Sequence, residues 1–207
     1  MRFLLVGFAL LVLSSPALAD NANSTLPLHG VVTTFGPCPI LPPSGPDPCA
    51  QQTLVTQVNV GDALCAYLLV RHYDDCAGVQ TAFEWPAAWP LTFGLWDCQS
   101  NQVNGTTPTA SGPTTGTIAT AFDCLSGGVT APIGRLHFAG AFAPGCITQV
   151  ESTYPFFTHM VDCDGGTHPI IEQNRGSICA GSPGVDACEP VVPVEAATWG
   201  TIKSQYQ

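Results

Sequence analysis

The segment Asp162-Cys163-Asp164-Gly165-Gly166 carries acidic residues arranged like the start of a calcium-binding loop. An EF-hand loop begins with oxygen ligands at alternate positions and has a glycine that allows a sharp turn. It ends on a bidentate glutamate at position 12, where this chain has Gln173, one residue after Glu172. We therefore expect either a calcium site at Asp162 and Asp164 or an acidic turn held by a neighbouring disulfide.

Three tryptophans, Trp85, Trp89 and Trp96, offer flat apolar faces on which a sugar ring could stack. Tyr67 and Tyr73 could extend such a platform. Aromatic side chains also supply much of the buried area in the cores of β-sandwiches. The sequence thus allows a glycan platform or core and corner packing, and the second interpretation is favoured.

Acidic residues are the best candidates for hydrolytic chemistry. A glycosidase needs two carboxyl groups about 5–10 Å apart, and only the fold can bring together two of Glu84, Glu151, Glu172 and Asp164. The five histidines are scattered and form no H-E-x-x-H motif, so a catalytic metal is not expected. The sequence therefore favours a protein that is not an enzyme, with a secreted hydrolase as an alternative.

The N-terminal residues have the features of an export signal. Arg2 precedes a short apolar run, Phe3 to Leu13, and small residues follow at Ala17 and Ala19. The run is shorter than the roughly 20 residues that a spanning helix needs, and the Ala-x-Ala pattern predicts cleavage after Ala19. We therefore expect residues 1–19 to be removed and the rest to be secreted, without a transmembrane segment.

All ten cysteines follow that predicted cleavage site: Cys38, Cys49, Cys65, Cys76, Cys98, Cys124, Cys146, Cys163, Cys179 and Cys188. An even number in an exported chain predicts up to five disulfides, and the absence of C-x-x-C speaks against metal binding. Short turn-rich loops favour two local bridges, and a sequential pattern would complete the set. The expected pairs are Cys38–Cys49, Cys179–Cys188, Cys65–Cys76, Cys98–Cys124 and Cys146–Cys163.

Alternation of apolar and polar residues in short segments predicts β-strands, and turn residues separate them. The chain contains 21 glycines and 19 prolines, while residues 99–114 form a Thr/Gly/Pro/Asn-rich stretch that predicts an exposed loop. The pattern predicts an all-β sandwich or barrel, and we expect an antiparallel sandwich, such as a jelly roll, over residues 20–189. Residues 190–207 would form a tail with a short helix over 196–206. Strands are expected at 29–35, 53–60, 63–73, 79–85, 91–97, 115–123, 133–142, 147–154, 157–161 and 168–172.

The formal net charge of the chain is −10, and only 10% of its residues are charged. Nucleic acid and anionic lipid surfaces attract proteins of the opposite sign, so neither is expected as a partner. Self-association remains open, because extended segments near the ends could add a strand to a neighbour. A glycan or another cell-surface partner also remains open, and no cofactor other than calcium is indicated.

Two segments resemble parts of uncharacterised secreted bacterial proteins. The stretch Ala77-Gly78-Val79-Gln80-Thr81-Ala82-Phe83-Glu84-Trp85, with Trp89-Pro90 after it, resembles a strand and tryptophan corner of cohesin-like or immunoglobulin-like sandwiches. The ending from Val194 to Tyr206 is similar to a VExxTWGxIKxxY tail on such exported proteins. The resemblance implies an exported β-sandwich with a C-terminal signal, and it implies no activity.

These observations lead to one main functional hypothesis. Few charges, many cysteines and no assembled catalytic motif favour a non-enzymatic extracellular protein with a structural, adhesive or surface-associated role. Self-assembly is a variant of this hypothesis. A carbohydrate-binding module that uses the tryptophans, and a hydrolase that uses the acidic residues, are the alternatives.

Overall fold

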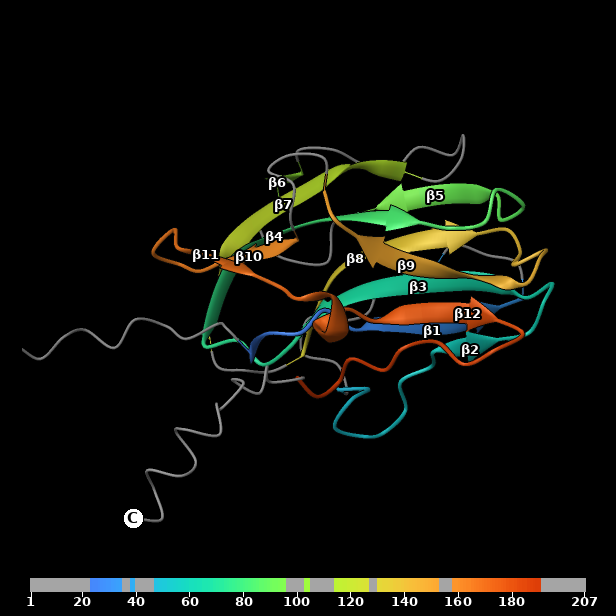
Figure 1. Ribbon diagram of the computed structural model, residues 1–207, viewed down its shortest axis with the longest axis horizontal. Helices are drawn as coiled ribbons and strands as arrows, with labels where there is room; N and C mark the ends of the chain where they lie inside the picture. The colour runs from blue at the N-terminus through green and yellow to red at the C-terminus, as the bar shows by residue number, and fades with distance from the viewer. Residues whose placement is uncertain are drawn as a thin grey trace, which may run out of the picture.

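Two β-sheets packed face to face make up the fold (Figure 1). The computed structural model describes residues 23–34, 38–39, 47–95, 103–104, 114–126, 130–152 and 158–190. The smaller sheet has the order β1-β3-β8-β5, with every neighbouring pair antiparallel. Its strands are β1 (Leu28–Thr33), β3 (Ala63–Val70), β5 (Leu91–Leu95) and β8 (Ala131–Phe138).

The second sheet has eight strands and runs β11-β10-β4-β9-β12-β2, while β7 pairs with β4 and β6 pairs with β7. Only the pairing of β12 with β2 is parallel among these described strands. The expected disulfide-stapled all-β sandwich is therefore confirmed. The strands are β2 (Gln57–Val58), β4 (Asp75–Glu84), β6 (Val103–Asn104), β7 (Thr114–Ser126), β9 (Gly145–Val150), β10 (His159–Val161), β11 (Thr167–Pro169) and β12 (Ser177–Ala180).

Strand β3 is buried on both faces. Leu64 and Leu68 belong to the main core between the sheets, whereas Cys65 and Tyr67 belong to a second buried cluster. Because successive side chains point to opposite faces of a strand, the second cluster lies on the outer face of the smaller sheet. This double burial accounts for the nearly continuous apolar sequence of β3.

Aromatic rings fill the main core near one end of the sheets. Phe138 is fully buried and meets the rings of Trp85 and Trp89 edge-on, at centroid distances of 5.5 and 5.8 Å. The indole Nε1 of Trp89 donates a hydrogen bond to the backbone oxygen of Ala143 at 2.8 Å. The Trp-Pro corner between β4 and β5 therefore packs inward and anchors the turn between β8 and β9.

Some expected elements differ from the observed ones. The 53–60 segment pairs only at β2, and β6 lies inside the stretch expected to be a loop. Strand β12 was not predicted, because it has four residues and lies between Gly176 and Gly181. It forms because β9 and β2 both pair with it and its four residues are buried. The expected export segment and the expected tail helix lie outside the described residues.

Four disulfides are present, and none of the predicted pairings among the described cysteines is correct. Cys146 and Cys179 show the reason: they face each other across β9 and β12, with Cα atoms 4.0 Å apart. Strand pairing therefore brings these two cysteines together, and closeness along the chain does not decide the pairing. The bridges are Cys38–Cys65, Cys49–Cys188, Cys124–Cys163 and Cys146–Cys179.

Two cysteines remain after these four bridges. Cys98 lies outside the described residues. Cys76 is a buried free thiol on β4, and burial raises its pKa to about 12. A thiol that is buried and protonated at neutral pH is a poor nucleophile. Within the described part of the chain, no helix is long and apolar enough to cross a membrane.

Replacing Phe138 by alanine should lower the free energy of unfolding by about 3–5 kcal/mol, because it leaves a cavity between the sheets. The matched control is Phe93→Ala on the neighbouring strand β5. Phe138 has 0% of its surface exposed and Phe93 has 53%, so the control should change stability by about 0.5 kcal/mol. Denaturant unfolding measures both, and equal losses would contradict this description of the core.

Candidate functional site

The predicted calcium ligand Asp162 lies in the tight turn between β10 and β11. Its Oδ1 accepts a hydrogen bond from the backbone N–H of Gly166, and its Oδ2 lies 3.0 Å from Nε2 of His168. The bond to His168 is the main reason that the pKa of Asp162 is below its usual range. Asp164 is exposed in the same turn. Calcium at these residues stays a prediction, while the geometry shows Asp162 organising the turn.

Two of the three tryptophans proposed as a glycan platform are core residues. Trp85 and Trp89 expose 4% and 1% of their surface, and both pack on Phe138. Their faces therefore cannot stack on a sugar, and the platform interpretation is wrong for this pair. Trp96 lies outside the described residues. Tyr67 is also fully buried, and its hydroxyl donates to the backbone oxygen of Pro39.

Two of the acidic residues considered for hydrolysis, Glu84 and Asp164, lie far apart. Gly78 of β4 pairs with Val161 just before the turn that carries Asp164, and Glu84 lies six residues farther along β4. At about 3.3 Å per residue, Glu84 and Asp164 are roughly 20 Å apart. Glu151 accepts hydrogen bonds from Arg175 and from the backbone N–H of Thr158. Arg175 also lines a cavity of about 110 Å³ with Glu172.

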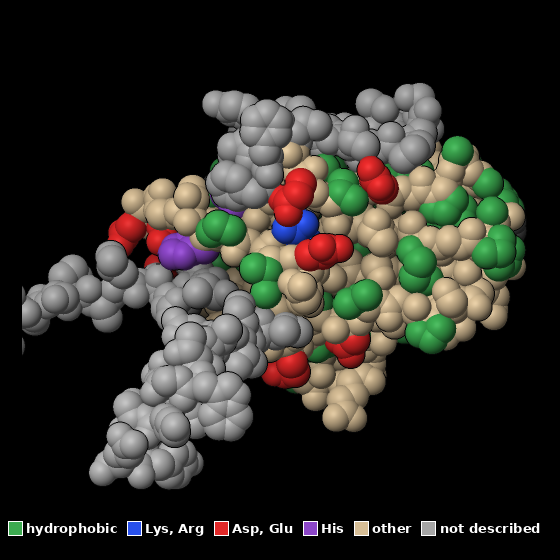
Figure 2. All heavy atoms as spheres, in the orientation of Figure 1, with side chains coloured by type: hydrophobic (Ala, Val, Ile, Leu, Met, Phe, Trp, Pro, Cys, Tyr) green, Lys and Arg blue, Asp and Glu red, His purple; other side chains and the backbone are tan. Residues whose placement is uncertain are grey.

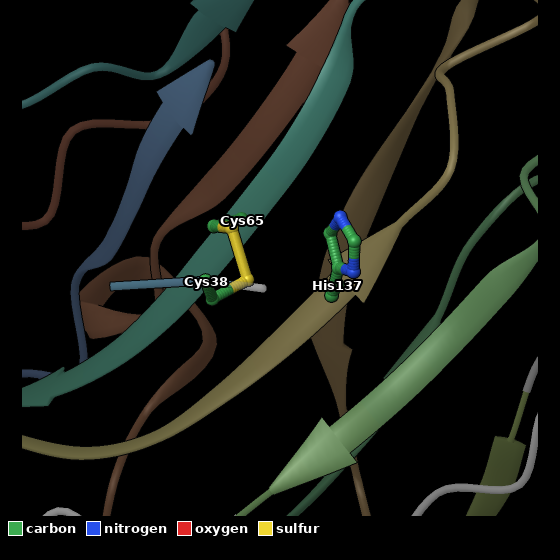
Figure 3. Close-up of side chains that lie close together, drawn as sticks. All are labelled: Cys38, Cys65 and His137. Carbon is green, nitrogen blue, oxygen red and sulfur yellow. A yellow bond between two sulfur atoms is a disulfide. The ribbon is translucent and has the colours of Figure 1, made fainter. Parts of the chain in front are cut away.

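One group of side chains with metal-ligating atoms does come together in the described part of the chain. Atoms of Cys38, Cys65 and His137 lie within 4.8 Å of one another. Figure 3 shows the Cys38–Cys65 disulfide beside the His137 ring. We call this group the outer-face cluster. Sequence reasoning missed it, because the three residues are far apart in the chain and no spacing pattern links them.

The segment at Cys38 and Pro39 is held against the outer face of the smaller sheet by more than the disulfide. The Nη1 of Arg135 donates to the backbone oxygen of Cys38 at 2.8 Å. Tyr67 donates to the backbone oxygen of Pro39 at 2.5 Å. These contacts bury Tyr67 and Arg135. The outer face of β3 and β8 therefore carries a small polar and sulfur-containing core of its own.

A second polar region surrounds the Cys49–Cys188 disulfide, where the described chain ends. Arg71 lies 3.6 Å from Asp47 and 3.5 Å from Glu189. The ring of His72 is 2.7 Å from the backbone oxygen of Cys188, and its φ of 56° is unusual for a residue with a side chain. Next to it lies a cavity of about 370 Å³, lined by Cys49, Gln52, Leu54, Asp186, Cys188 and Glu189. We call this region the Cys49–Cys188 region.

Hydrophobic side chains gather at one end of the sandwich, at the right of Figure 2, and Asp62 in the β2–β3 turn is the charged residue of the turns at this end. The β2–β3, β4–β5 and β8–β9 turns lie at this end (Figure 1). Val60 and Phe142 expose 46% and 58% of their surface in two of these turns. Backbone hydrogen bonds from Gly61 to Ala141 and from Ala141 to Asp62 join the same two turns. We call this end the apolar tip.

No family model and no curated protein matches the chain. Among solved structures, a cohesin module from a family 33 glycoside hydrolase of Clostridium perfringens ATCC13124 is similar to it. The TM-score is 0.42 and the identity is 11%, over 76% of this chain and 96% of that chain. We draw no conclusion about this protein from a likeness at that level.

Asp162→Asn should destabilise the protein at neutral pH and have no effect at low pH. A carboxyl group whose pKa is lower in the folded state stabilises that state above the unfolded pKa, about 3.9. The difference in unfolding free energy between wild type and variant should therefore shrink as the pH falls through the folded pKa. Denaturant unfolding from pH 7 to pH 2 measures it. Asp164→Asn in the same turn is the control, and an equal effect there would contradict the role of Asp162.

Proposed function

We propose that this chain is a secreted, non-enzymatic structural or adhesive module that makes contacts through its apolar tip. The observation that carries the proposal is the exposure of Val60 and Phe142 at an end of the sandwich where hydrophobic side chains gather. Contiguous exposed apolar surface on a soluble domain usually marks an interaction site. The buried tryptophans give no support to carbohydrate binding by Trp85 and Trp89.

The partner that fits the tip is a second copy of the chain. A net charge of −10 makes two copies repel each other over most approaches. Contact between two tips removes the exposed apolar area of Val60 and Phe142 from water, and it brings together one Asp62 carboxylate from each copy. Self-association at the tip therefore combines a hydrophobic gain with the repulsion of few like charges.

Secretion is the second part of the proposal. Four disulfides form and persist readily in oxidising compartments, and the N-terminal residues have the features of an export signal. The tail after Pro190 would then be a sorting or anchoring signal that follows the Cys49–Cys188 region in the sequence. In this arrangement the sandwich is the exposed working part and the tail determines where it is held.

Phe142→Asp should abolish self-association, because it places a carboxylate in the apolar contact. Light scattering coupled to size-exclusion chromatography over a range of concentrations measures the mass. Phe93→Asp is the matched control, since Phe93 is exposed to a similar extent on β5, and it should associate like wild type. A wild-type chain that stays monomeric throughout, or two variants that behave alike, would argue against the tip as the contact.

Removing residues 191–207 should leave stability unchanged and release the protein from the cell surface. The main core and all four described disulfides involve residues before Pro190. Thermal unfolding of the shortened chain and its distribution between cells and medium are the two measurements. A lower melting temperature with unchanged surface retention would show that the tail packs on the sandwich instead.

A further inference from the structure

The outer-face cluster has the composition of a metal site that the disulfide now blocks. We propose that reduction of the Cys38–Cys65 disulfide creates a two-thiolate, one-imidazole site for Zn²⁺ with His137. Thiolate sulfur and imidazole nitrogen are the ligands that zinc prefers. While the two sulfurs are bonded to each other they cannot supply thiolates, so the site belongs to the reduced chain alone.

Strand register places the ligands together. Cys65 of β3 lies directly opposite His137 of β8, and directly opposed residues in an antiparallel pair have Cβ atoms about 4.5–5.5 Å apart. The third ligand, Cys38, has its Cα 5.6 Å from that of Cys65. Zn–S bonds of about 2.3 Å and Zn–N bonds of about 2.0 Å put tetrahedral ligand atoms roughly 3.5–3.8 Å apart. Ligand atoms already within 4.8 Å therefore need only small movements.

The cysteine outside the sheet has contacts that do not depend on the disulfide. Arg135 donates to the backbone oxygen of Cys38, and Tyr67 donates to that of Pro39. Both donors are buried residues of β8 and β3. They should keep Cys38 over the sheet after reduction, with its thiol near Cys65.

The histidine is suited to act as a ligand. Its Nδ1 lies 2.9 Å from Oγ1 of Thr92, and a hydrogen bond to one ring nitrogen fixes the orientation of a ligating histidine. Burial lowers the pKa of His137. Burial thus favours the neutral ring, which is the form that binds metals.

The reaction balances with a dithiol as reductant. The dithiol loses two electrons and two protons and forms its own disulfide, while the Cys38–Cys65 bond breaks and each sulfur gains one proton and one electron. Zn²⁺ then displaces the two thiol protons, which pass to solvent. Two thiolates neutralise the charge of the ion, and the three protein ligands leave the fourth tetrahedral position to water.

The test is a cobalt titration of the purified chain. The protein is reduced with a dithiol, freed of it without oxygen, and titrated with Co²⁺, which reports thiolate ligands through a charge-transfer band. Wild type should bind Co²⁺ with this band, and the double variant Cys38→Ser/Cys65→Ser should lose it while keeping the other described disulfide cysteines. His137→Ala should weaken binding at least about tenfold. His29→Ala, which changes a histidine on the same sheet face, should bind like wild type.

A second measurement identifies the cysteines directly. Zn²⁺ should slow alkylation of Cys38 and Cys65 in the reduced chain, as read by peptide mass spectrometry, and should leave Cys146 and Cys179 unprotected. Absence of the band in reduced wild type would overturn the proposal. So would a band that survives in the double variant, equal affinities of His137→Ala and His29→Ala, or equal protection of both cysteine pairs.

Discussion

The antiparallel pairing of β3 with β8 is the interaction on which the rest of the structure depends. Its register puts Leu64 opposite Phe138 on the inner face, where both enter the main core. The same register puts Cys65 opposite His137 on the outer face. A slip by one residue would turn the inner set outward and the outer set inward. The core and the outer-face cluster therefore depend on one choice of register.

The disulfides stabilise elements that this central pair does not reach by itself. Cys124–Cys163 joins the end of β7 to the β10–β11 turn, and Cys49–Cys188 closes a separation of 139 residues. On the loop-entropy model a bridge across so long a separation stabilises by about 4–5 kcal/mol, since it restricts the unfolded chain most. A chain with short strands and many turns gains much from such links. The disulfides thus stabilise the outer elements, while a few central strands form the core.

Period-two patterning was enough to predict the sandwich, because alternating burial leaves a local trace in the sequence. The apolar run over 63–73 predicted a strand, and the structure confirms one at Ala63–Val70. Pairing between strands leaves no such trace. Cys146 and Cys179 are bridged because β9 lies beside β12, and the sequence near either cysteine does not contain that information. Strand β12 itself was missed because its stability comes from its neighbours and its own four residues show too short a pattern.

The candidate sites were harder to predict for the same reason. Trp85 and Trp89 are of a residue type suited to sugars. They are buried because they pack on Phe138, which is far from them in the sequence but close in the fold. Asp162 and Asp164 matched part of a ligand pattern, yet the Asp162 carboxylate accepts from Gly166 and lies in hydrogen-bonding contact with His168. Conversely, His137 had no motif around it and gained its neighbours only through register. Residue type limits the possible chemistry, whereas the pairing of strands selects among the possibilities.

The net charge of the chain and the oxidation state of its cysteines each determine what one part of its surface can bind. With a net charge of −10 on the whole chain, contact surfaces are favoured where charges are few, and the three turns of the apolar tip carry one charged residue, Asp62. With buried sulfur held beside a histidine, the oxidation state decides whether the outer face has a covalent staple or a set of metal ligands. Arg135 and Tyr67 contact the backbone oxygens of Cys38 and Pro39, and these hydrogen bonds do not involve the sulfur atoms. The same sheet can therefore hold the segment in both states, and a change in redox conditions would change its chemistry without requiring a new fold.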